Sequence, residues 1–559
     1  MRISISLLLA GAMLWSYPAL AAQTPQDPAT DIKAEAVSET SGETTVDVTP
    51  VEPVDPFSVA LEEAFKGWPK AKTLAAKKDL AGLKEHYTQN SFKPLWIEDG
   101  KLSMRARKLI FFLSRAGRDG LNPEDYKTPS LSIGKDSSVT LDELARAELE
   151  LSLAIVTYAR HAQAGRLKPT KVSKSITLVP VSPDPLAVID QVSSAEKPEK
   201  SLHSFQPQQD GYKRLREQLA KFRTLPKEKT PIQIAPGKAL KLGSKGKRVE
   251  ALRERLNVAA TEENTRAVFD EALLKAVKEF QKNKDLHVDG IVGRRTLAIL
   301  NGKKTSSEAD LIANMEMWRW MPRDLGRFHV FVNVPEYRLR VYKDGSQTHT
   351  TRVVVGKFRN KTPIFSDEME HVVVNPYWNV PASIAVKELL PKIRRDPRGY
   401  LAKRNYQVLT RVKGRTRVVD PRQINWSKFN AGRVRIRQAP GGRNALGRIK
   451  FLFPNKHAVY LHDTPSKSLF SRQRRAFSHG CIRVHNPFEF AEALFAEDKD
   501  WNSARLRSML GNKERWVNLD KHVPVHLAYF TIRVNDDGDL NTFDDIYGHI
   551  GKLKVSLGL

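Results

Sequence analysis

Residues 477–487 read FSHGCIRVHNP and contain Cys481, the only cysteine in a chain of 559 residues. A helix signal follows, since Asn486-Pro487 supplies an N-cap and a first-turn proline. Gly480 permits a close approach or an unusual backbone angle. Three polar residues surround the thiol: Ser478, His479 and Arg483. A lone cysteine is often a small buried residue, but these neighbours favour an exposed nucleophile on a turn between β structure and a helix.

A nucleophilic thiol, whose ordinary pKa is about 8.5, needs a base to attack a carbonyl at neutral pH. His462 is the best candidate, because the alternating run AVYLHDTP (458–465) places it at the end of a strand. His479 competes by proximity, although the intervening glycine favours a turn. A zinc site is a weak alternative, because the sequence has no HExxH motif and the histidines are poorly spaced. No metal or cofactor is expected.

The region before this motif has the alternating pattern of a β-rich domain. FHVFVNV (328–334) and YRLRVY (337–342) have period two, and Lys343-Asp344-Gly345 predicts a hairpin turn. Residues 381–450 interrupt this rhythm with 19 Lys and Arg against three acids, a local net charge of +16. A long basic insertion beside a catalytic motif is typical of a lid or binding loop. A solvated surface excursion is the alternative.

The N-terminus predicts export. Residues 1–22 have a basic start, an apolar run and a small-residue site at Ala19-Leu20-Ala21, which is the pattern of a secretory signal peptide. Residues 23–56 form an acidic linker that we expect to be disordered. No further stretch is long and apolar enough for a transmembrane segment. The net charge of +29 would suit a nucleic-acid binder, but export and the lack of aromatic stacking motifs interleaved with the basic run argue against that class.

Two helical regions are expected between the linker and the β-rich domain. Residues 57–235 contain a capping box at Thr140–Glu143 followed by a long amphipathic run that stops at Gly165, and they carry no catalytic constellation. Residues 236–302 predict a three-helix unit, which has two apolar faces. The residues assigned to these faces are Val249, Leu252 and Leu256 on one, and Ala272, Ala276, Val277 and Phe280 on the other.

Two resemblances follow from these patterns. Leu242-Gly243, Gly246, Phe280-Gln281 and the DGIVG run at 289–293 resemble the peptidoglycan-binding helical repeat, although Asp285-Leu286 replaces its usual Gly-Leu. His462, fifteen intervening residues and then SHGC with Arg483 resemble the L,D-transpeptidase signature. NPYWNVP (375–381) and QAPGGRNALGRIKFLFPN (438–455) resemble the large, lid-bearing members of Gram-negative periplasms.

The resemblance implies a multidomain α+β chain. It would have a helical scaffold domain (57–235), a small peptidoglycan-binding module (236–302) and a mainly β catalytic domain (326–510). The basic lid would be residues 381–450, and residues 511–559 would form a C-terminal tail packing on the catalytic domain. A three-helix unit that binds nothing is the alternative for the module. The implied location is the periplasm.

The resemblance also implies roles for residues. Cys481 would be the nucleophile, His462 the general base and acid, and His479 a supporting residue. The backbone around Gly480 would form the oxyanion hole. Arg483 would bind a substrate carboxylate, with a structural salt bridge as the alternative. Trp378 would line the donor cleft unless it is a core aromatic. Ser478 and Tyr460 complete the substrate-binding candidates.

The implied reaction joins two peptidoglycan stem peptides. Cys481 would attack a tetrapeptide donor after its diaminopimelate, expel D-Ala and pass the acyl group to a diaminopimelate amine, giving a 3→3 cross-link. Carbapenems would acylate the same thiol. The alternatives are transfer to water, to a D-amino acid or to an anchored protein, and a non-catalytic wall-binding scaffold. Cell-wall synthesis proteins are possible partners.

Overall fold

The computed structural model describes residues 55–130, 139–224, 232–260, 265–284, 286–301 and 307–559. The expected signal peptide and almost all of the expected acidic linker therefore lie outside the described residues. Asp55 and Pro56, which were assigned to the linker, belong instead to the first helix. The Asp55 carboxylate accepts from Phe57 N, and the helix starts at Pro56.

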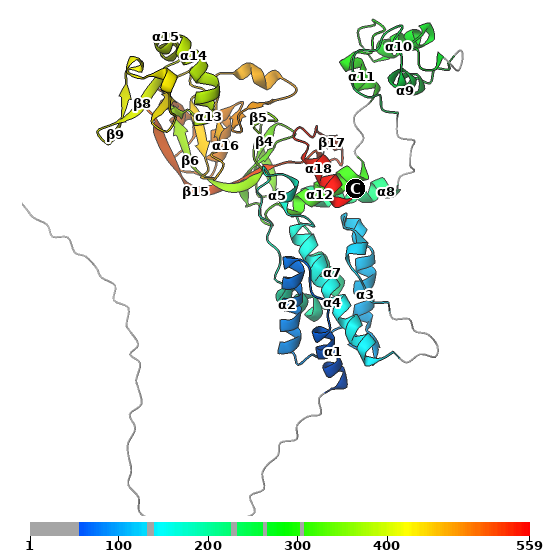
Figure 1. Cartoon of the computed structure of the whole chain (residues 1–559). Helices are drawn as coiled ribbons and strands as arrows, with labels where there is room; N and C mark the ends of the chain where they lie inside the picture. Colours follow the sequence, from blue (N-terminus) through cyan, green and yellow to red (C-terminus); the bar gives the residue numbers. More distant parts are fainter. Residues whose placement is uncertain (1–54, 131–138, 225–231, 261–264, 285, 302–306) are drawn as a thin grey trace, which may run out of the picture. The chain divides into compact units, whose positions relative to one another are not determined.

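A helical region follows, built around the long helix α4 (Leu141–Ala164) (Figure 1). The Thr140–Glu143 capping box is present, and Gly165 ends the helix, as predicted. Apolar residues along α4 pack with α1, α2, α3, α6 and α7 into one core. The bounds of these and the neighbouring helices are α1 Pro56–Lys66, α2 Leu74–Gln89, α3 Met104–Ser114, α5 Pro169–Val172, α6 Pro185–Ser194, α7 Pro198–His203 and α8 Asp210–Thr224. The short strands β1 (Ile97–Glu98) and β2 (Lys101–Leu102) form a hairpin between α2 and α3.

Three helices form the next unit and enclose a small core of their own: α9 (Lys247–Arg255), α10 (Glu271–Asn283) and α11 (Arg294–Leu300). The expected face with Val249 and Leu252 is buried. The face expected on α10 is confirmed in part: Val277 is buried and Phe280 packs against the core, whereas Ala272 is exposed and Leu273 and Gln281 are buried instead. The buried residues follow the spacing i, i+4, i+8 from Leu273. The expected face included Ala272 and Ala276, which lie to one side of this stripe.

The C-terminal region is a nine-stranded sheet with the order β13-β5-β14-β12-β11-β6-β15-β3-β4, in which β4 also pairs with β5. The sheet therefore closes on itself. The Asp344-Gly345 hairpin joins β4 to β5 with positive φ angles at both residues, as predicted. The strands are β3 Phe328–Asn333, β4 Arg338–Lys343, β5 Ser346–Gly356, β6 Phe365–Val374, β11 Ile449–Leu452, β12 Leu461–His462, β13 Ala476–Ser478, β14 Ile482–Val484 and β15 Arg515–Ala528.

The expected catalytic-domain boundary at residue 510 is wrong. Strand β15 lies between β6 and β3 in the middle of the sheet, so residues 511–559 are part of the domain and not a tail that packs on it. The domain continues through β16 (Ile532–Val534), β17 (Leu540–Thr542) and α18 (His549–Leu557). Helices α12 (Glu308–Arg319), α16 (Pro487–Leu494) and α17 (Ser503–Ser508) complete it. α16 begins at Pro487, as the sequence predicted.

The basic insertion is a folded subdomain. Its sheet has the order β7-β10-β8-β9, and a separate apolar core includes Leu389, Ile393, Trp426 and Ile436. Its elements are β7 Trp378–Asn379, α13 Ala382–Ile384, a π-helical turn at Ala385–Leu389, α14 Leu390–Arg395, α15 Pro397–Lys403, β8 Tyr406–Val412, β9 Arg415–Val419 and β10 Val434–Gln438. We call residues 378–438 the lid subdomain.

Candidate active site

Strands β12 and β14 bring the sequence-predicted residues together. They run parallel, with Leu461 opposite Ile482 and His462 opposite Arg483. The amide of Ile482 donates to the carbonyl of Tyr460, which brings Cys481 beside Tyr460. Because alternate residues of a strand share a face, Tyr460 and His462 lie on one face, with the rings 5.7 Å apart. Cys481, His462, Arg483 and Tyr460 thus form one cluster.

The Cys481 thiol lies in the turn between β13 and β14 and is partly exposed. Its Sγ is 3.9 Å from the carbonyl oxygen of Ala458. Burial raises the pKa of the thiol, while hydrogen bonds from Tyr460 and the positive charge of Arg483 act in the opposite direction. The resting residue is therefore a protonated thiol at neutral pH, and a base must remove its proton before attack.

His462 has the properties of such a base. It is 4% exposed, and its Nδ1 donates to the carbonyl oxygen of Asp463 at 2.5 Å. A carbonyl can only accept, so Nδ1 carries the proton and Nε2 has a free lone pair. Burial, helped by the nearby charge of Arg483, lowers the pKa of His462 to about 3. The imidazole is therefore neutral at neutral pH and its Nε2 is free to accept, while the low pKa makes it a weak base in this resting structure.

Arg483 lies beside this base without a carboxylate. Among the described residues it forms no ion pair, and its buried Nε has no hydrogen-bond partner. Burial lowers the pKa of its guanidinium. The structural salt bridge considered from the sequence is thus not formed within the described part of the chain. A partly buried guanidinium with unused donors suits a carboxylate that arrives with a ligand.

Ser478 and Gly480 are used within the turn itself. The Ser478 hydroxyl donates to the carbonyl of Cys481 at 2.5 Å and accepts from the amide of Gly480 at 3.1 Å. Gly480 has a φ of 124°, a region that favours glycine. Because the Gly480 amide already donates to Ser478, the amide of Cys481 is the better candidate for stabilising an oxyanion.

Two residues that sequence reasoning missed hold this turn from outside. The Thr362 hydroxyl donates to the carbonyl of Gly480 at 2.8 Å, and the Thr362 amide donates to the Tyr547 hydroxyl at 3.1 Å. Tyr547 in turn donates to the carbonyl of Gly356 at 2.5 Å. These contacts join segments nearly 200 positions apart, so no local pattern could have identified them. They fix the position of the turn that carries Cys481.

His479 points to the lid subdomain. Its Nε2 lies 2.5 Å from Glu388 Oε1 and 3.2 Å from Lys357 Nζ. One nitrogen cannot both donate to a carboxylate and accept from an ammonium, so the two contacts cannot form at once as hydrogen bonds of Nε2. Glu388 and Lys357 were not identified from the sequence. The partners of His479 fit a supporting role and not that of principal base.

Trp378 belongs to the lid subdomain. It lies on β7, opposite Gln438 of β10, and its ring lies 6.3 Å from that of Tyr406. It is only partly buried, so its ring retains surface that a ligand could contact.

Among the described residues no group of three or more His, Cys, Asp or Glu side chains could hold a metal ion. Within the same residues no helix has the length and hydropathy of a membrane span.

Family models match three parts of the chain. They are a "Scaffold domain" at residues 81–219, a "Putative peptidoglycan binding domain" at 245–300 and an "L,D-transpeptidase catalytic domain" at 327–497. The third model contains all the residues of the cluster described above.

A curated protein and several solved structures are similar over part of the chain. A "Putative L,D-transpeptidase" of Haemophilus influenzae is 37% identical over 256 residues, which is 45% of this chain and 51% of that protein. The chain thus spans about half the length of the curated relative. An L,D-transpeptidase structure from Xylanimonas cellulosilytica is 16% identical, covers 52% of this chain and 98% of its own, and has a TM-score of 0.15. The Ldtfm-avibactam carbamoyl enzyme is 13% identical, covers 36% of this chain and 49% of its own, and has a TM-score of 0.16.

Proposed function

Taking residues 327–497 as an L,D-transpeptidase catalytic domain, we propose that Cys481 forms a thioester with peptidoglycan stem peptides and transfers the acyl group to form 3→3 cross-links. The observation that carries this proposal is the cluster on β12 and β14. It combines a thiol, a neutral imidazole with a free Nε2 and an unpaired guanidinium. These are a nucleophile, a base and a carboxylate-binding group.

Acylation uses each group once. His462 Nε2 takes the thiol proton while Sγ attacks the carbonyl that follows the third residue of a tetrapeptide donor. The amide of Cys481 donates to the developing oxyanion. The C–N bond to the terminal D-Ala then breaks, and His462 returns the proton to the leaving amine. Arg483 binds a carboxylate of the donor and holds it during both steps.

Deacylation decides the product. The side-chain amine of an acceptor diaminopimelate attacks the thioester, the C–S bond breaks and the thiol recovers a proton. This gives the 3→3 cross-link. The same thioester could pass to water, to a free D-amino acid or to an anchored protein. The lid subdomain favours a second peptide, because its excess of Lys and Arg attracts an acidic stem.

The setting that we propose is the periplasm. The signal-peptide pattern of residues 1–22 supports export. The match at residues 245–300 supports binding of the module to the wall. No metal or cofactor takes part in the proposed chemistry.

Replacement of the nucleophile tests the proposal. The full chain is incubated with disaccharide-tetrapeptide, and the products are identified by mass spectrometry. We expect loss of D-Ala together with a cross-linked dimer, and Cys481→Ala should lower turnover at least about 1000-fold. A carbapenem should add its mass to the wild-type chain only. His371→Asn, on β6, is the matched control and should be fully active. Full turnover by Cys481→Ala would exclude a thioester mechanism. Absence of turnover in the wild-type chain, unchanged by Cys481→Ala, would favour a non-catalytic scaffold.

A further inference from the structure

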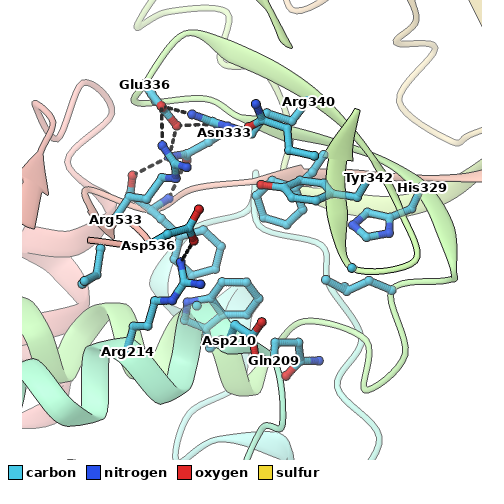
Figure 2. A pocket seen from close by; sticks show the side chains of 18 of the residues that line it. Gln209, Asp210, Arg214, His329, Asn333, Glu336, Arg340, Tyr342, Arg533 and Asp536 are labelled. Carbon is cyan, nitrogen blue, oxygen red and sulfur yellow. Dashed lines mark hydrogen bonds and ion pairs between the residues drawn. The ribbon is translucent and has the colours of Figure 1, made fainter. Parts of the chain in front are cut away.

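A cavity of about 770 Å³ lies between the start of α8 and strands β3 and β4 (Figure 2). Its walls come from residues 208–214 around the start of α8, from Trp318 on α12, from strands β3 and β4, and from residues 530–536 around β16. None of Cys481, His462, His479 and Arg483 lines it. Its volume is within the range of small-ligand sites, about 300–1,000 Å³.

One wall of the cavity is aromatic. The rings of Trp318 and Phe530 stack at 4.5 Å, and Phe331 lies nearly parallel to Phe530 at 6.2 Å. A side chain at Gly211 would place its Cβ 2.2 Å from the Trp318 ring, so glycine allows the indole to lie there. Nearby, Tyr342 stacks on His329 at 5.1 Å. Phe331 and Phe530 are buried beneath this wall, and the partly buried rings of Trp318 and Tyr342 are the flat apolar surfaces left for a ring-shaped ligand.

The charged groups that line the cavity balance one another. Glu336 pairs with Arg340 and lies 3.8 Å from Arg533, and Arg214 pairs with Asp536 at 2.5 Å. With Asp210, the lining has three cationic and three anionic side chains. A site for a phosphate, a carboxylate or a basic peptide would carry an excess of one sign. This balance favours an uncharged ligand.

Two polar atoms of the lining remain unused. The amide group of Gln209 donates to the carbonyls of Pro322 and Arg323, while its buried Oε1 has no hydrogen-bond partner among the described residues. The Nε of Arg340, a residue that is 5% exposed, also has no partner there. Buried polar atoms are normally satisfied. Both atoms are covered by their neighbours, so a ligand with hydroxyl or amide groups would reach them after small shifts of the lining side chains.

We propose that this cavity binds a neutral saccharide segment. The C–H faces of a pyranose ring would stack on the aromatic wall, and its hydroxyl or acetamido groups would meet Gln209 Oε1 and Arg340 Nε. The natural source of such a segment would be the glycan strand that carries the stem peptides, and in this respect alone the inference rests on the proposed function. The cavity would then hold the strand while the stem reaches Cys481.

Hydrogen exchange of the full chain, with and without tetra-N-acetylchitotetraose at millimolar concentration, tests this site. We expect slower exchange in residues 205–216 and 328–347. Protection confined to residues 240–300 would assign the sugar to the three-helix unit and overturn the proposal. Protection of the cavity segments by a sugar-free tetrapeptide, and not by the sugar, would overturn it in favour of a peptide site. Absence of protection anywhere would also overturn it.

Variants separate the cavity from its neighbours. Gln209→Leu should weaken sugar binding about threefold to tenfold, the effect of one hydrogen bond. Trp318→Leu should weaken it at least tenfold, whereas Trp516→Leu, which removes an exposed indole on β15, should leave it unchanged. Cys481→Ala should keep the protection of residues 205–216 and 328–347. Loss of turnover with retained protection would show that the two sites are independent.

Discussion

Two arginines of the C-terminal domain, Arg319 and Arg483, differ in how their donors are used. Arg319, at the end of α12, is 1% exposed and donates to Glu316, Gln206 and Tyr212 and to the carbonyl of Asp119. Arg483 lies opposite His462, and its Nε has no partner among the described residues. A guanidinium that holds a fold together is saturated by the fold, whereas one that awaits a ligand is not.

Removal of Arg319 should have the largest effect on stability. Arg319→Met leaves Glu316 buried without its cation, and the expected loss is about 3–5 kcal/mol of the free energy of unfolding. Chemical denaturation followed by hydrogen exchange in α4 and α12 measures it. Arg327→Met is the control, because Arg327 forms exposed ion pairs with Asp344 and Glu497 that contribute at most about 1 kcal/mol. Equal losses of stability in the two variants would mean that burial of Arg319 adds nothing to its contribution.

The corresponding change at Arg483 should affect function and not stability. Arg483→Met removes a partly buried charge that lacks a carboxylate, so the free energy of unfolding should be unchanged or higher. The KM for the tetrapeptide donor should rise about 10–100-fold, because a charge-assisted hydrogen bond is lost. Arg474→Met, an exposed neighbour, should change neither quantity. Loss of stability with unchanged KM would make Arg483 a structural residue.

A second comparison concerns pH. Burial holds the pKa of His462 at about 3 and those of His526 and His549 at about 4. Below pH 6.5 the unfolded chain binds protons that these histidines do not bind in the folded state, so stability falls as the pH falls. Each contributes up to about 1.4 kcal/mol per pH unit between the two pKa values. In the helical region the pKa of Glu148 is raised to about 7 and that of His161 is lowered to about 3. Their contributions to the pH dependence of stability therefore have opposite signs.

The catalytic domain should therefore lose more stability than the helical region between pH 7 and pH 5. Hydrogen exchange, corrected for its intrinsic pH dependence, gives the opening free energies of β15 and α4 separately. His549→Gln should reduce the slope for β15, with His371→Asn, whose side chain is 32% exposed, as the control. A steeper slope in α4 than in β15 would contradict this assignment of the buried groups.

Sequence reasoning was most accurate where the chemistry is local. Cys481, His462 and Arg483 lie within a short span that contains two strand ends and a helix start, and the structure brings them together. The position of β15 in the sheet was missed because strand pairing between distant segments leaves no local pattern. Thr362 and Tyr547 were missed for the same reason. The lid subdomain appeared weakly patterned because its small core is built from short elements.

The smallest expected effect concerns the lid subdomain and its three acids, which have different partners. Glu388 contacts His479, Asp396 caps α15 through the amide of Gly399, and Asp420 pairs with Arg422 within the lid. Only Glu388 therefore connects the lid to the catalytic turn.

Glu388→Gln keeps the shape of the side chain and removes its charge, so the lid should be held less firmly against His479. An exposed ion pair contributes up to about 1 kcal/mol, so carbapenem acylation should slow about twofold to fivefold, with faster hydrogen exchange in residues 382–395. Asp420→Asn is the matched control, since it removes a lid charge that has a local partner. Equal effects of the two variants would mean that the net charge of the lid matters. An effect of Glu388→Gln alone would mean that the contact with His479 couples lid position to the reactivity of Cys481.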